Sequence, residues 1–155
     1  MRIRTDYVTN SSSSSFIVGF KSKDDVKEQL GNELYIGRNF DRVLKDILKN
    51  HISKDEALHI FKDEMYWDAR FIIEREYERK LGWREFYNWI EAPENKTAFE
   101  NAVKERVNVW FSEFKQKIEG LEYLSLVEYS DHVDGDLEHE VMPRLDCTIQ
   151  RFSHH

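Results

Sequence analysis

Cysteine is almost absent from this chain, since Cys147 is the only one among 155 residues. A single thiol excludes a disulfide within the chain and any zinc site built from several cysteines. Cys147 shares a predicted strand face with Ile149, which favours a small buried apolar residue over a nucleophile. A nucleophilic role is further disfavoured because no base stands beside Cys147 in the sequence.

Long apolar runs are also missing, so the sequence predicts no membrane-spanning segment. The first residues, Met1-Arg2-Ile3-Arg4, lack the apolar core that a secretory signal peptide requires. We therefore expect the protein to reside in the cytoplasm.

Positive charge is absent from residues 119–140, although the net charge of the whole chain is only -7. That stretch contains eight acidic residues and no lysine or arginine: Glu119, Glu122, Glu128, Asp131, Asp134, Asp136, Glu138 and Glu140. Such a segment repels phosphate backbones, which argues against non-specific nucleic-acid binding. It favours a metal ion or a basic protein surface as partner, although a solvated acidic loop is the plainer interpretation.

Diagnostic catalytic motifs are missing as well. If Gly135 took the sixth position of an EF-hand loop, Ser130 would be first and Val141 twelfth, and neither supplies the required carboxylate. His139-Glu140 is not followed by the second histidine of a zincin helix. The chain also has no phosphate-binding loop and no Gly-x-Ser-x-Gly elbow.

The residues that are present predict strands at both ends and helices between them. Alternating or continuous apolar residues indicate strands at 3–8, 16–20, 122–129 and 147–152. Residues 131–145, which contain Gly135 and Pro143, are expected to be mainly loop with one helical turn. The chain should form a single domain, 1–155, of the α+β class. Its small, mostly antiparallel sheet would be built from the terminal strands, with the helical middle packed on one face.

Capping residues and apolar spacing predict helices at 22–31, 39–50, 53–81, 83–90 and 93–118. Ser53 followed by Glu56 is the clearest capping box, and Gly82 closes the helix that it opens. The expected apolar stripes of the two long helices are Leu58, Phe61, Met65, Ala69 and Ile72, and Phe99, Val103, Val107, Trp110, Phe114 and Ile118.

A run of five serines stands between the first two predicted strands: Ser11, Ser12, Ser13, Ser14 and Ser15. Serine runs are typical of flexible linkers. This one would tether only ten residues, so an ordered loop is the alternative. Its hydroxyl and amide groups would then hold a phosphate or a carbonyl oxygen, or simply satisfy a turn.

Pairing of the terminal strands would bring the serine run, the acidic segment and the C-terminal histidines to one end of the sheet. Imidazole and carboxylate groups together suit zinc, manganese or iron. The predicted metal ligands are Asp131, His139, His154 and His155. Glu138 would be the general base for a metal-bound water, and the five serines would bind the substrate phosphate.

Two functions remain open from these residues. The first is a small hydrolase that acts on a phosphoester or a nucleotide with zinc or manganese as cofactor. The second is a non-catalytic binding protein, such as a phage or mobile-element accessory factor, that docks a basic partner through its acidic face. Neither hypothesis fixes the oligomeric state.

The two ends of the chain resemble those of many short, uncharacterised proteins of Gram-positive bacteria and their phages. The similar segments are Val8-Thr9-Asn10-Ser11-Ser12-Ser13-Ser14-Ser15-Phe16-Ile17-Val18 at the start, and Tyr129-Ser130-Asp131, Glu138-His139 and Arg151-Phe152-Ser153-His154-His155 near the end. The resemblance implies that both ends belong to one pattern and suggests a bacterial or phage setting. It implies no activity, fold or ligand.

Overall fold

The computed structural model describes residues 13–154. The predicted strand at 3–8, Ser11, Ser12 and His155 lie outside the described residues. The sheet strands are β1 (Ser13–Phe20), β2 (His51–Ile52), β3 (Tyr123–Ser130) and β4 (Thr148–His154). The α-helices are α1 (Val26–Gly31), α2 (Phe40–Lys49), α3 (Lys54–Leu81), α4 (Trp83–Ile90), α5 (Pro93–Ile118) and α6 (Asp131–Asp136). Shorter helical turns are η1 (Lys23–Asp25), η2 (Gly37–Asn39), η3 (Leu137–Val141) and η4 (Met142–Arg144).

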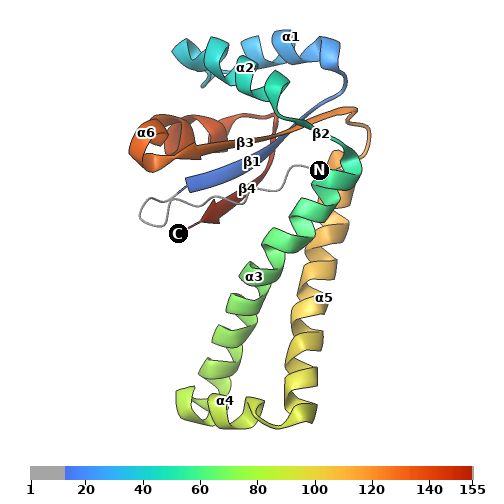
Figure 1. The fold of residues 1–155 in the computed structure, drawn as a ribbon, viewed down its shortest axis with the longest axis vertical. Helices are drawn as coiled ribbons and strands as arrows, with labels where there is room; N and C mark the ends of the chain where they lie inside the picture. Colours follow the sequence, from blue (N-terminus) through green and yellow to red (C-terminus); the bar gives the residue numbers. More distant parts are fainter. Residues whose placement is uncertain (1–12, 155) are drawn as a thin grey trace. The chain divides into compact units, whose positions relative to one another are not determined.

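The four strands form one antiparallel sheet in the order β2-β3-β1-β4 (Figure 1). Strand β1 lies in the middle, and Phe16 is paired with Val127 of β3 on one side and Arg151 of β4 on the other. The two ends of the chain therefore meet in the sheet, while the middle of the chain is helical. This arrangement confirms the predicted α+β fold.

Apolar side chains on one face of the sheet form its core with α1 and α2, which lie over the sheet in Figure 1. Phe16 and Val18 of β1 are fully buried there, together with Val43 and Ile47 of α2. Burial of each such side chain contributes about 1.5–3 kcal/mol. The amphipathic spacing of α2 thus fixes which of its sides packs on the sheet.

Local sequence signals set both ends of α3. The Glu56 backbone N–H donates to Ser53 Oγ at 3.0 Å, and the Ser53 backbone N–H donates to Glu56 Oε1 at 3.4 Å. These are the two reciprocal bonds of a capping box, as predicted. At the other end Gly82 has a φ of 88°, a left-handed conformation that a residue with a Cβ rarely adopts.

The chain divides into two compact units. The first, here called the sheet unit, comprises the chain up to Leu58 and from Phe114 onward; the second, the helical unit, comprises His59–Glu113. The prediction of a single domain stays a prediction. Each unit has its own core, and that of the helical unit contains six buried residues: Ala69, Ile73, Phe86, Phe99, Val103 and Val107.

Three local predictions were wrong. Residues 131–145 are mostly helical rather than loop, because α6, η3 and η4 follow one another there. The short strand β2, which pairs with Ser125 and Leu124, was not predicted, since two residues carry no periodic signal. Ile72 was assigned to the core stripe of α3 but is 36% exposed, and its neighbour Ile73 is buried in its place.

None of the described helices combines the length and the apolar character needed to cross a membrane.

Candidate functional site

Ser14 and Ser15, at the end of the serine run, belong to strand β1 and lie on opposite faces of the sheet. Successive side chains of a strand point to opposite faces, and directly paired residues share a face. Ser14 is paired with Tyr129 and Ser153, whereas Ser15 is paired with Glu128 and Phe152. We call the face of Ser14 the first face and that of Ser15 the second face. The described serines are strand residues and not a loop.

Glu138 of η3 lies against the first face and is completely buried. Ser14 Oγ donates a hydrogen bond of 2.8 Å to Glu138 Oε1, and Arg151 Nε donates one of 3.2 Å to Ser14 Oγ. Arg151 Nη2 also lies 3.9 Å from Glu138 Oε1. Two strands, β1 and β4, therefore hold one oxygen of this carboxylate, which η3 carries.

The other oxygen of the same carboxylate, Glu138 Oε2, is buried and has no hydrogen-bond partner among the described residues. His139 Nε2 lies 3.4 Å from it, and Asp131 offers a carboxylate oxygen to the same group. The three ligand-type atoms of Asp131, Glu138 and His139 all lie within 4.8 Å of one another. Asp131 and His139 are exposed, so this cluster extends from the buried Glu138 carboxylate to the protein surface.

The remaining described site residues lie on the second face. Ser15 Oγ donates a hydrogen bond of 3.2 Å to Glu128 Oε2 and lies 3.4 Å from His154 Nε2. His154 is paired with Ser13, and both share the face of Ser15. The structure thus gathers Asp131, Glu138 and His139, and places His154 and Ser15 across the sheet from Glu138. Ser11, Ser12 and His155, which were predicted to join the site, lie outside the described residues.

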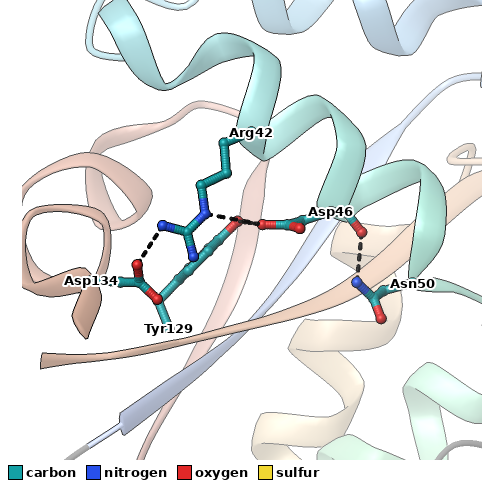
Figure 2. A network of polar contacts seen from close by, with 5 residues as sticks. All are labelled: Arg42, Asp46, Asn50, Tyr129 and Asp134. Carbon is teal, nitrogen blue, oxygen red and sulfur yellow. Dashed lines mark hydrogen bonds and ion pairs between the residues drawn. The ribbon is translucent and has the colours of Figure 1, made fainter. Parts of the chain in front are cut away.

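A polar network beside the cluster connects α2 to α6, as Figure 2 shows. Arg42 of α2 bonds Asp134 of α6, and Tyr129 OH donates a hydrogen bond of 2.8 Å to Asp46 of α2. Burial, and donation to the Asp46 carboxylate, raise the pKa of Tyr129, so its hydroxyl remains a donor at neutral pH. The network fixes α6, the helix that begins with Asp131.

A cavity of about 270 Å³ runs along the same side of α2 and is lined by Arg42, Asp46, Asn50 and residues 126–129. None of the three clustered residues Asp131, Glu138 and His139 lines this cavity. Its polar groups largely bond one another, including Asn50 Nδ2, which donates to the Asp46 carbonyl at 2.7 Å. The cavity and the cluster are therefore separate features of the sheet unit.

Sequence reasoning missed Arg151 and Arg42. Arg42 belongs to no motif, Arg151 belongs only to the closing segment of the resemblance, and each acts through a partner more than 90 positions away. The one available signal was that Arg151 follows Cys147 and Ile149 at alternate positions of the predicted strand, which puts a cation on an otherwise apolar strand face. Cys147, in contrast, is confirmed as a core residue at 1% exposure, and burial raises the pKa of its thiol.

No family model, curated protein or solved structure matches this chain.

Proposed function

We propose that the protein is a small metal-dependent hydrolase of the phosphoester or nucleotide class, with Asp131, Glu138 and His139 as ligands of a zinc or manganese ion. The cytoplasmic location and the bacterial or phage setting expected from the sequence belong to the same proposal.

The observation that carries the proposal is the buried oxygen Glu138 Oε2, which lacks a hydrogen-bond partner among the described residues. An unsatisfied buried polar group costs about 1–3 kcal/mol, and more when it is charged. Folding retains such a cost where a ligand restores the missing interaction. A divalent cation beside Glu138 Oε2 would do so, and the neighbouring His139 and Asp131 supply its further ligands.

One distance within the cluster, that between Glu138 Oε2 and His139 Nε2, suits a small tetrahedral ion. Two ligands that each lie 2.0–2.1 Å from such an ion are about 3.3 Å apart. Glu138 Oε2 and His139 Nε2 lie 3.4 Å apart, so these two atoms need almost no adjustment. One nitrogen and two oxygen ligands match the preferences of zinc and manganese.

Three protein ligands are the usual number in catalytic zinc sites, which keep one position for water or substrate. An ion held there lowers the pKa of its water to about 7 and polarises a phosphoryl oxygen. Arg151 contributes a positive charge next to the cluster, and its side chain is 33% exposed. A guanidinium in this position suits an anionic phosphoester.

The proposal changes three roles that the sequence suggested. His154 is no longer a ligand, because the strand register places it across the sheet from Glu138. Glu138 becomes a ligand instead of a general base, because its carboxylate is fully buried and one oxygen is held by Ser14. Ser14 becomes a residue that orients this carboxylate, because its hydroxyl proton is already donated to Glu138. Ser13 and Ser15 lie on the second face, across the sheet from the cluster, so neither contacts a substrate phosphate bound there.

The alternative, docking of a basic partner through residues 119–140, has less support. Four acids of that stretch already form ion pairs within the protein, and these pairs are Glu122 with Lys54, Asp134 with Arg42, Asp136 with Arg38, and Glu140 with Arg144. Glu138 is buried as well. Much of the acidic surface is thus neutralised internally.

Calorimetric titration with zinc and with manganese tests the metal site. We expect one ion per chain in the wild type, and loss of binding in His139→Ala. His132→Ala is the matched control, because His132 is an exposed histidine of α6 outside the cluster and should leave binding unchanged. Equal affinity of wild type and His139→Ala would show that the assigned ligands are wrong.

Hydrolysis is tested separately with the metal-loaded protein and bis(p-nitrophenyl) phosphate. We expect turnover by the wild type and by His132→Ala, and none by His139→Ala. Stoichiometric metal binding without turnover of this or of nucleotide substrates would leave a metal-binding protein and reject the hydrolase.

A further inference from the structure

We propose that the outward face of α3 is a self-association surface, on which a second copy of this chain packs its own α3 in antiparallel orientation. This inference concerns the helical unit alone and does not depend on the metal site.

The centre of the surface is apolar. Trp67 and Phe71 are 66% and 59% exposed and lie one turn apart on α3, and Ile72 is 36% exposed beside them. The core of the helical unit uses Ala69 and Ile73 on the other side of the same helix. Large side chains on one helix surface, left out of the core, mark an interaction site.

Two charged residues beside this apolar centre lack an ionic partner among the described residues. Asp68 lies one turn before Ile72, and Arg75 lies one turn after Phe71; both are exposed. Arg75 contacts the Phe71 ring, with its guanidinium carbon 4.9 Å from the ring centroid. Seven residues of helix separate Asp68 from Arg75 by about 10.5 Å, so they do not pair within one helix.

A two-fold axis between two copies would give both Asp68 and Arg75 a partner of opposite charge. If the axis passes between Phe71 and Ile72, Asp68 of each copy opposes Arg75 of the other, and Phe71 opposes Ile72. Symmetric dimers use one self-complementary patch in this way. The neighbouring exposed charges are consistent with this antiparallel arrangement. Arg79 and Lys80 follow Arg75 along α3, so this end of the surface is basic. The exposed acid in that half, Glu76, is already paired with Arg106.

The charge pattern also disfavours other occupants. A strongly basic or strongly acidic partner would satisfy one of Asp68 and Arg75 and oppose the other. A copy of the same chain satisfies both with no change in the surface. Complementary charges of this kind fix orientation, while the apolar centre supplies most of the affinity.

Analytical ultracentrifugation from low to high micromolar concentration tests the proposal, with zinc omitted so that the metal site plays no part. We expect a reversible monomer–dimer equilibrium in the wild type. Phe71→Glu should abolish the dimer, because it places a charge at the apolar centre. Val109→Glu is the control, since Val109 is a 56% exposed apolar residue of α5 outside the surface.

Charge reversal gives a sharper test. Asp68→Arg places two arginines opposite each other in its own dimer, and Arg75→Asp places two aspartates, so each variant should have a dissociation constant raised about tenfold or more. In an equimolar mixture every arginine opposes an aspartate. We therefore expect the mixture to form a heterodimer with nearly wild-type affinity, while circular dichroism verifies that both variants are folded.

Three results would overturn the proposal. The wild type is monomeric at all concentrations, or its dimer survives Phe71→Glu and both charge reversals, or the mixture of folded reversal variants fails to associate. The second result would assign self-association to another surface, and the third would reject the antiparallel register.

Discussion

The two units of this protein differ in whether polar side chains are buried in them. The helical unit has an apolar core, and no buried side-chain nitrogen or oxygen among its described residues lacks a hydrogen-bond partner. Tyr66 OH and Arg70, for example, both donate to Glu100, at 2.9 Å and 2.5 Å. The sheet unit contains all the buried polar residues found among residues 13–154, namely Ser14, Ser15, Ser125 and Glu138.

The difference indicates where each unit is specialised. A core of packed aromatic rings, such as Phe86 with Phe99 and Tyr77 at centroid distances of 5.9 Å and 6.1 Å, gives stability and needs no ligand. A buried carboxylate with an unsatisfied oxygen costs stability, and such costs concentrate at functional sites. We therefore expect chemistry in the sheet unit and association in the helical unit.

Removal of a core ring from the helical unit should have the largest effect. Phe86 is 2% exposed and contacts the rings of Tyr77, Trp89 and Phe99. Phe86→Ala should lower the free energy of unfolding by about 3–5 kcal/mol, measured by urea denaturation. Phe71→Ala, at a 59% exposed phenylalanine of the same unit, is the control and should change it by about 0.5 kcal/mol or less at dilute concentration. Similar losses in the two variants would contradict the core described for this unit.

Glu138→Gln should increase the stability of the metal-free protein. Glutamine keeps an acceptor for Ser14 and removes the buried charge, so we expect the free energy of unfolding to rise by about 1–2 kcal/mol. Added zinc should then raise the melting temperature of the wild type and not that of Glu138→Gln. Asp136→Asn provides the control, because Asp136 is an exposed acid of α6 outside the cluster. Lower stability of Glu138→Gln without metal would show that the ionised carboxylate stabilises the fold, and the proposed site would lose its main support.

The Arg70–Glu100 pair should give the smallest effect, and one that depends on pH. Burial raises the pKa of Glu100, but hydrogen bonds from Arg70 and Tyr66 outweigh it and hold the pKa below its usual range. A lowered pKa in the folded state stabilises the protein above the unfolded value of about 4.3, and this stabilisation is lost as the pH falls through the folded value.

Arg70→Met should therefore cost about 1 kcal/mol or less at pH 7, since both side chains are about 30% exposed. The cost should shrink as the pH falls below about 4.3. Unfolding in urea at several pH values measures it. A cost that is the same at neutral and acidic pH would mean that Arg70 acts through packing, for instance on the Phe99 ring, and not through the Glu100 carboxylate.

Several parts of the fold follow from short-range signals. The capping box at Ser53 and the left-handed Gly82 bound α3 as predicted, because both act within one helical turn. Residues 131–145 were predicted to be mainly loop, since Gly135 and Pro143 disfavour helix in isolation. There the ion pair of Asp134 with Arg42 and the burial of Leu137 and Glu138 against the sheet override propensity.

The candidate site was predictable only in part. Asp131, Glu138 and His139 are close in sequence, and the consecutive elements α6 and η3 bring them together. Residue type and spacing therefore selected Asp131 and His139 as candidate ligands and Glu138 as a candidate base. The strand register decided the rest. It places Ser14 with Glu138 on the first face and Ser15 with His154 on the second, and a shift of one residue would exchange them.

The sequence by itself determined the α+β class, the main helices and the residue types available for a metal site, because these depend on composition and on contacts within a few residues. Only the tertiary structure decided that Ser14 and Arg151 hold one oxygen of Glu138 and that the other has no hydrogen-bond partner among the described residues. That arrangement depends on pairings between residues more than 100 positions apart. No local pattern specifies such pairings, because they result from which sheet register buries the most apolar surface.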